Sequence, residues 1–195
     1  MSFRIEEKLF IDKNYILDFK KLLNLKSSNK IYETRNIQSL YFENKNDDMY
    51  RDSIESITPR KKIRIRNYPN QSSKEFFLEK KISSVEGRFK KRTIINLDKF
   101  NEYKKIGIFD KNYGLCLPKI LINYQREYFK IGDVRITIDE NITYKPYSKE
   151  SIKKDITSII ELKTSINKNF DDLIKEFPFH RKRFSKYCNA IDLLT

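Results

Sequence analysis

The sequence has few residues that would build a zinc site or a disulfide framework. Its 195 residues include one histidine, His180, and two cysteines, Cys116 and Cys188. A single histidine excludes a His-rich zinc site, so any metal must be a hard ion held by carboxylates and phosphate. The two cysteines lack framework spacing, and we expect them to be buried and reduced.

Long apolar runs are also missing. No stretch approaches the ~20 apolar residues of a membrane-spanning helix, and the N-terminus has no apolar signal core. We therefore expect a soluble, cytoplasmic protein without a membrane segment. The composition is nevertheless globular, because fourteen Phe and twelve Tyr residues can bury a substantial area. This length fits one domain over residues 1–195.

Acidic residues are outnumbered by basic ones. The chain holds 41 Lys and Arg residues against 27 Asp and Glu residues, a formal net charge of +14. Such a balance indicates a polyanionic partner, which could be nucleic acid, polyphosphate, a nucleotide or an acidic membrane surface. Charge alone does not choose among them.

The most informative stretch is residues 59–68, which is strongly basic and yet alternates like a β-strand. In an extended chain Arg60, Lys62, Arg64 and Arg66 lie on one face, with isoleucines on the other. Alternate residues are ~7 Å apart, so at an effective dielectric of ~20 each neighbouring pair repels by roughly 2 kcal/mol. The row predicts an anionic ligand, and its spacing suits a chain of phosphates.

Seven other segments alternate in a similar way, and most have one apolar and one charged face. Helices are predicted after Asp12, after Asp98 as an N-cap, and from Phe184 onward, whereas the pattern does not place residues 49–58. The fold class is α+β, mainly β: about eight antiparallel strands close into a barrel or tunnel, with helices packed outside and the C-terminal helix at one tunnel mouth. An open sheet with a wet charged face is the alternative. The other strands are expected at 3–11, 36–43, 75–83, 88–96, 119–130, 134–140 and 157–165.

The start of the C-terminal helix is basic over residues 180–183. Cations oppose the helix dipole at this end, so the stretch is either an anion site or a basic surface turn.

The ordered set of motifs resembles the polyphosphate-polymerase (VTC) domain family within the triphosphate tunnel metalloenzymes. The resemblance covers nearly the whole chain. Its motifs are Arg4-x-Glu6-x-Lys8, Ser39-Leu40-Tyr41-Phe42, Lys62-x-Arg64-x-Arg66-x-Tyr68, Leu78-Glu79-Lys80-Lys81, Tyr124-x-Arg126, Val134-Arg135-Ile136-x-x-Asp139, Glu161-Leu162-Lys163 and Arg183-Phe184-Ser185-Lys186.

The resemblance implies an enzyme that adds the γ-phosphate of ATP to a growing polyphosphate chain with a divalent ion, Mn²⁺ or Mg²⁺. Expected partners are ATP, triphosphate or polyphosphate, and no nucleic acid. Phosphoryl transfer needs positioning and charge neutralisation more than a covalent catalyst. The implied catalytic residues are Arg64, Arg66, Lys81, Arg126, Arg135 and Glu161; the phosphate-binding residues are Lys8, Lys62, Lys90, Arg92, Tyr124, Lys163, Arg183, Ser185 and Lys186; and the metal ligands are Glu161 and Glu6.

One departure from the superfamily bears on the reaction. Hydrolytic relatives place two or more glutamates on one face of the first strand. Here Glu6 shares its face with Arg4 and Lys8, whereas Glu7 points the other way, which favours polymerisation or binding over hydrolysis. A metal-dependent triphosphate or nucleoside-triphosphate hydrolase, a non-catalytic polyphosphate-binding protein and a nucleic-acid-binding protein are the alternatives.

Overall fold

The computed structural model describes residues 4–71, 75–165 and 183–194. The strands are β1 (Arg4–Asp12), β2 (Asn29–Glu43), β3 (Arg60–Asn67), β4 (Phe76–Ser84), β5 (Gly87–Ile95), β6 (Ile108–Asp110), β7 (Gly114–Ile131), β8 (Val134–Pro146), β9 (Lys153–Lys154) and β10 (Thr157–Ser165). The helices are the 3₁₀ turn η1 (Lys13–Tyr15), α1 (Ile16–Leu25), α2 (Asp48–Ile54), α3 (Leu97–Ile106) and α5 (Lys186–Leu194).

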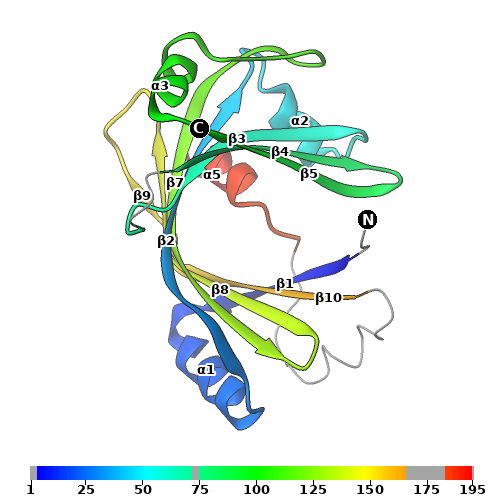
Figure 1. Cartoon of the computed structure of the whole chain (residues 1–195), viewed down its shortest axis with the longest axis vertical. Helices are drawn as coiled ribbons and strands as arrows, with labels where there is room; N and C mark the ends of the chain where they lie inside the picture. The colour runs from blue at the N-terminus through cyan, green and yellow to red at the C-terminus, as the bar shows by residue number, and fades with distance from the viewer. Residues whose placement is uncertain (1–3, 72–74, 166–182, 195) are drawn as a thin grey trace. The chain divides into compact units, whose positions relative to one another are not determined.

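The fold is a mainly antiparallel β structure with helices, which confirms the predicted class (Figure 1). Paired strands follow the order β1-β10-β8-β7-β2-β3-β4-β5, with β6 added to β7 and β9 to β8. Over the described residues this path begins at β1 and ends at β5, so the closed barrel stays a prediction. None of the described helices has the length and apolar character needed to cross a membrane.

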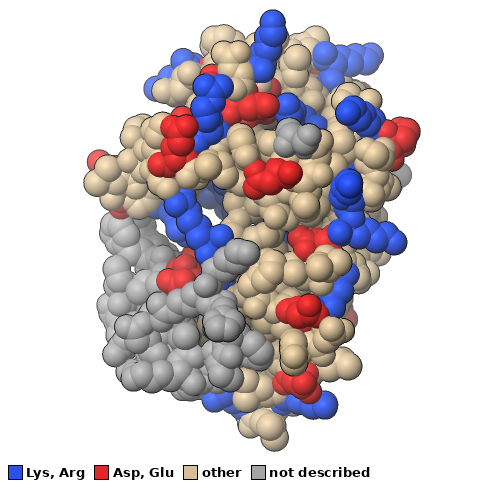
Figure 2. Space-filling view, turned by 180° about the vertical axis from the view of Figure 1, so that it is seen from behind, with Lys and Arg blue, Asp and Glu red and all other residues tan. Residues whose placement is uncertain are grey.

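The described residues form two compact units. Unit 1 contains residues 4–35, 124–142, 154–165 and 183–184, and unit 2 contains residues 36–71, 75–123, 143–153 and 185–194. Each unit has an apolar cluster of its own. Basic and acidic side chains are mixed on the surface drawn in Figure 2.

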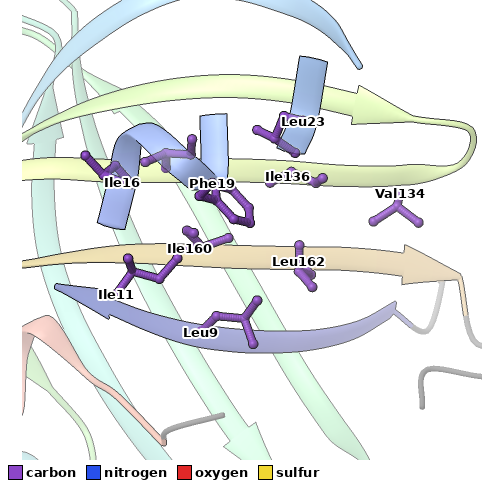
Figure 3. Close-up of a cluster of buried hydrophobic side chains, with 10 residues drawn as sticks. Leu9, Ile11, Ile16, Phe19, Leu23, Val134, Ile136, Ile160 and Leu162 are labelled. Carbon is purple, nitrogen blue, oxygen red and sulfur yellow. The ribbon is translucent and has the colours of Figure 1, made fainter. Parts of the chain in front are cut away.

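Unit 1 is built on the apolar faces of β1, β8 and β10. Leu9, Ile136 and Leu162 come from these strands and lie in one buried cluster. Helix α1 covers that cluster with Phe19 and Leu23, as Figure 3 shows. The predicted helix start is confirmed, because the Asp12 carboxylate accepts a hydrogen bond from the Asn14 amide and caps η1, which leads into α1. The charged residues of these strands therefore lie on the opposite face of the sheet.

Unit 2 repeats this arrangement with β3, β4 and α3. Ile63 and Ile65 from β3 are fully buried in its cluster. The Phe100 ring of α3 stacks on Phe76 of β4 with centroids 4.2 Å apart. The predicted face of β3 is thus confirmed: isoleucines face the apolar cluster, and the basic residues lie on the other side.

Several predicted boundaries differ from the observed ones. The N-cap of α3 is Asn96, whose side chain accepts from the Lys99 amide, and not Asp98, which lies in the first turn. The strand predicted to begin after Pro118 begins at Gly114 and runs through the proline, and β2 begins seven residues earlier than predicted. All of α2 except its first residue, Asp48, lies in the segment that the pattern did not place, and β6 and β9 were missed.

Helix α5 packs on the other face of unit 2. Tyr187 stacks on Tyr41 of β2, with ring centroids 5.0 Å apart and planes at 21°. Tyr41 is opposite Arg64 in the β2–β3 register, so its side chain is on the charged face. The predicted helix is confirmed over Lys186–Leu194. Of the basic stretch predicted at its start, residues 180–182 lie outside the described residues.

Gly107 is the C-cap of α3. Substituting it tests how closely the end of α3 approaches β7. Its φ is +83°, and a Cβ atom there would lie 2.6 Å from the Cys116 carbonyl oxygen. We expect Gly107→Ala to lower the free energy of unfolding by roughly 3 kcal/mol, because strain and a backbone clash add. Gly114→Ala is the control, since its φ is +69° with nothing within 4 Å, and it should cost about 1 kcal/mol. Equal losses in urea denaturation would contradict the packing argument.

Candidate phosphate-binding site

The charged face of β3, β4 and β5 in unit 2 is organised in rows across the three strands. Antiparallel register places Arg64, Glu79 and Arg92 directly opposite one another. In these strands Glu79 is the only acidic residue. Eight basic residues share the face with it, so the face is strongly cationic: Arg60, Lys62, Arg64, Arg66, Lys81, Arg88, Lys90 and Arg92.

Glu79 is the anion around which this face is assembled. Its side chain is 1% exposed, and one carboxylate oxygen accepts from the Nε and Nη2 atoms of Arg64, with Nε 2.8 Å away. Its other oxygen lies 3.5 Å from Lys90 Nζ and 3.7 Å from Arg92 Nε. Arg92 also covers the Phe77 ring at 3.6 Å from its centroid. A buried carboxylate thus fixes three of the predicted phosphate ligands.

The surrounding charge keeps Glu79 ionised. Burial by itself raises its pKa, but Arg64, Arg66 and Lys90 outweigh that effect and lower the pKa to about 2. Tyr41 has the same surroundings. Its hydroxyl accepts a hydrogen bond from Arg64 Nη1 at 2.8 Å. Burial raises the pKa of Tyr41, but the positive charges of Arg64, Arg66 and Lys62 outweigh this effect, so the pKa is lowered overall. Both pKa values are lowered by cations of the same group.

A row of three lysines lies beside the glutamate row. Lys62, Lys81 and Lys90 are directly opposite one another in β3, β4 and β5. Like charges at directly opposed positions are destabilising, so the row costs stability that a bound anion would restore. The register therefore brings together Lys62, Arg64, Arg66, Lys81, Lys90 and Arg92, all of which the sequence predicted as phosphate ligands.

The start of α5 joins this face. Lys62 Nζ donates to Ser185 Oγ at 2.7 Å, and Ser185 Oγ also accepts from the Cys188 amide. Lys186 is the first residue of the helix and is half-buried. Ser185, which directly precedes α5, is therefore held beside β3, and Lys186 is the next residue along the chain.

Glu43 fastens α5 to the end of β2. The buried carboxylate accepts from the backbone amides of Asn44, Met49 and Tyr50 and from the Tyr187 hydroxyl. Burial raises the pKa of Glu43 despite these hydrogen bonds. Tyr187 in turn stacks on Tyr41, so Glu43 supports the ring pair next to Arg64.

The charged face of unit 1 has a different balance, with acidic and basic residues alternating. Arg126 makes a two-point ion pair with Asp139, at 2.5 Å and 2.6 Å, and its Nη2 lies 3.8 Å from Glu161. Burial lowers the pKa of Arg126, but Asp139, Tyr124 and Glu161 raise it overall. The Tyr124 ring lies 5.4 Å from the guanidinium carbon of Arg126. Arg126 is thus held in place by carboxylates.

Two carboxylates on this face are candidate metal ligands. Lys163 Nζ lies 2.9 Å from Glu6 Oε1 and 3.3 Å from Glu161 Oε1, so one lysine bridges both. The described residues contain no group of three or more His, Cys, Asp or Glu side chains placed to hold a metal. Mg²⁺ and similar ions bind through one or two carboxylates together with substrate phosphates. The pair therefore fits a divalent ion that arrives with its phosphates.

The remaining predicted residues also lie in unit 1. Lys8 Nζ donates to the Phe184 carbonyl oxygen at 2.7 Å, and Lys8 is opposite Glu161 in the β1–β10 register. Arg135 is opposite Lys163 in β8, and its buried Nε has no hydrogen-bond acceptor within the described part of the chain. Arg183 is exposed. Glu7, as predicted, is opposite Leu162, away from this face.

The sequence reasoning missed several carboxylates that partner the arginines. Asp139 and Glu79 entered only as parts of motifs, and neither was given a role. A signal was available for Glu79, because β3 and β4 were predicted as neighbouring antiparallel strands. Their register alone would have placed Glu79 opposite Arg64. No short-range pattern pointed to Glu43, whose hydroxyl partner Tyr187 is 144 residues away.

Glu79 should make the fold sensitive to acid. Its pKa is lowered to about 2 in the fold, so its contribution is complete above the unfolded value near 4.5 and is lost as the pH falls from there towards 2. Glu79→Gln removes one partner of a buried ion pair and should lower the free energy of unfolding by roughly 3–5 kcal/mol at pH 7. It should also flatten the decline between pH 4.5 and 2. The exposed Glu86→Gln is the control; an unchanged acid profile in Glu79→Gln would contradict the assignment.

Solved structures with this fold come from bacteria, plants and archaea. A candidate adenylate cyclase from Bacillus halodurans has a TM-score of 0.62 and 13% identity, covering 94% of either chain. A candidate adenylyl cyclase from Hippeastrum with a dominant triphosphatase activity has a TM-score of 0.63 and 15% identity over 97% of this chain and 96% of that one. A conserved hypothetical protein from Pyrococcus furiosus has a TM-score of 0.62 and 16% identity, and the match covers 95% of this chain and 99% of that chain. At these identities the likeness shows the fold alone.

The sequence comparison is more specific. No curated protein matches the chain. The family model of the VTC domain, however, matches residues 3–114 and 98–195, which together cover nearly the whole sequence. These matches include the charged strands of both units and helix α5. The chain therefore belongs to the VTC domain family.

Proposed function

We propose that the chain is an ATP-dependent polyphosphate polymerase. The terminal phosphate of the growing chain attacks the γ-phosphorus of ATP, the bond to the β-phosphate oxygen breaks, and ADP leaves. The attacking oxygen is already anionic, so no protein nucleophile is required, and the protein contributes positioning and positive charge. The observation that carries the proposal is the row of opposed lysines Lys62, Lys81 and Lys90 beside the Arg64–Glu79–Arg92 row.

The two charged faces would divide the work. The face of unit 2 carries eight cations around one carboxylate and suits a long polyanion. The face of unit 1 combines Arg126, Arg135 and Lys163 with Glu6 and Glu161, and these two carboxylates would hold a divalent ion, Mn²⁺ or Mg²⁺, that neutralises charge on the reacting phosphates. The proposal includes the closed tunnel predicted from the sequence, in which both faces line one passage.

A surface site for nucleic acid has less support. On the face shown in Figure 2, acidic side chains lie between the basic ones, whereas nucleic-acid-binding proteins typically present a continuous basic patch or stripe. Arg64 and Arg66 are buried, 5% and 7% exposed, and could not reach a duplex.

Hydrolysis of triphosphate or a nucleoside triphosphate is the second candidate, and one observation favours it. The first strand offers only Glu6 on the charged face, but β10 brings Glu161 to the same lysine. The fold therefore provides a pair of carboxylates that the first strand alone lacks. The Hippeastrum protein described above shows that a triphosphatase occurs on this fold.

Incubation with ATP and Mn²⁺ separates the candidates. A polymerase gives ADP and long chains that a gel resolves, whereas a hydrolase releases phosphate without polymer. ADP formation without chains longer than triphosphate would contradict the proposal. Binding of polyphosphate with no turnover would leave only a binding protein.

Lys81→Gln tests the basic face of unit 2. We expect the dissociation constant for tripolyphosphate to rise about tenfold, because one charge-assisted contact is lost. Lys91→Gln is the matched control, because it also removes one positive charge. Lys91 is on β5, opposite Lys80, and therefore lies on the other face of the sheet. Its affinity should change less than twofold in calorimetry. Equal losses in both variants would indicate only a general effect of net charge.

Calorimetry also tests whether the two faces bind one ligand. We expect one tripolyphosphate per chain, and both Lys81→Gln in unit 2 and Arg135→Gln in unit 1 should weaken that single event. Two tripolyphosphates per chain, each sensitive to only one of these variants, would contradict a shared passage.

A further inference from the structure

A cluster of two tyrosines and two arginines lies in unit 1 beside the charged face. The Tyr32 and Tyr128 rings meet edge to face with centroids 5.4 Å apart. The Arg35 guanidinium carbon lies 4.8 Å from the Tyr32 centroid and 5.4 Å from that of Tyr128, and Arg135 lies 5.5 Å from Tyr128. Neither Arg35 nor Tyr32 belongs to the predicted site.

The two tyrosines differ in what they can contact. Tyr128 is buried, and the guanidinium carbons of Arg35 and Arg135 lie 5.4 Å and 5.5 Å from its ring centroid. Tyr32 is 47% exposed, so much of its ring faces solvent although it touches both Arg35 and Tyr128. Packing alone explains a buried tyrosine, but it does not require the ring of Tyr32 to be presented in this way.

An exposed tyrosine supported by an arginine has the chemistry of a nucleobase platform. Planar bases stack on aromatic rings and on guanidinium planes, and such stacking tolerates any base because every base has a π-face. The positive charge of Arg35 adds attraction to the electron-rich face of both the tyrosine and the base.

The cluster adjoins the residues that would bind phosphate and metal. Arg135 is opposite Lys163 in the β8–β10 register, and Lys163 contacts Glu6 and Glu161. Arg135 also keeps a buried Nε donor with no acceptor among the described residues. Unit 1 therefore contains two neighbouring carboxylates, Glu6 and Glu161, together with the Nε donor of Arg135 and the exposed ring of Tyr32.

We propose that Tyr32 and Arg35 stack on the base of the nucleotide donor while Arg135 binds its phosphates. The inference rests on the proposed function, because it requires a nucleoside triphosphate as substrate. It assigns the base to the Tyr32 side of Arg135 and predicts weak discrimination among bases, since the contact is stacking.

The absence of tryptophan from the chain gives a direct test. Tyr32→Trp introduces the only indole, and stacking of adenine on it should quench its fluorescence. We expect ATP to quench this variant and tripolyphosphate, which has no base, to leave its fluorescence unchanged. Tyr15→Trp is the matched control, because Tyr15 is a 60% exposed tyrosine in the same unit outside the cluster, and ATP should not quench it. Equal quenching of both variants, or none of Tyr32→Trp at saturating ATP, would overturn the assignment.

Affinities measured on Tyr32→Ala complete the test. We expect its dissociation constant for ATP to rise about tenfold, the loss of one base stack, while that for tripolyphosphate changes less than twofold. A wild-type chain that binds neither ligand would refute the proposed function. A chain that binds both, with Tyr32→Ala weakening both or neither, would refute the base site alone.

Discussion

The structure of unit 2 depends on burying cationic side chains in a sheet whose other face is apolar. Arg64 cannot leave this face without moving Ile63 and Ile65 out of the hydrophobic cluster, because the three residues alternate on one strand. An unpaired buried guanidinium would be very costly, and Glu79 supplies the single negative charge that makes the arrangement stable. On this face of β3, β4 and β5, basic residues outnumber Glu79 by eight to one.

The two units reach different charge balances from the same strand pattern. In unit 1, carboxylates alternate with cations across β1, β10 and β8, so the charges on this face nearly balance. In β3, β4 and β5 of unit 2, Glu79 is the one acidic residue and shares its face with eight basic residues. The first composition suits positioning of a metal-bound phosphate, and the second suits a polyanion of variable length. Neither balance is visible in the overall charge of +14.

Alternation predicted most strands and the orientation of β3, because side-chain direction in a strand is a local property. Local patterns did not predict elements whose boundaries or formation depend on long-range contacts. The strand of Pro118 continues through the proline, and α2 has too few apolar residues to stand out although Glu43 caps its backbone amides. The same holds for the site: the cations followed from the motifs, whereas partners such as Glu79 and Asp139 required strand register. Arg35 and Tyr32 had no sequence signal, since their shared partner Tyr128 comes from β7, far along the chain.

One lysine serves two roles in unit 2. Lys62 belongs to the basic row, and it also donates to Ser185 at the start of α5. An anion that takes over this donor would weaken the attachment of the helix. Thermodynamic linkage requires the converse as well: loosening α5 would make the lysine more available and tighten anion binding by the same factor. If Lys62 binds an anion as proposed, helix attachment and ligand affinity are therefore linked through a single ammonium group.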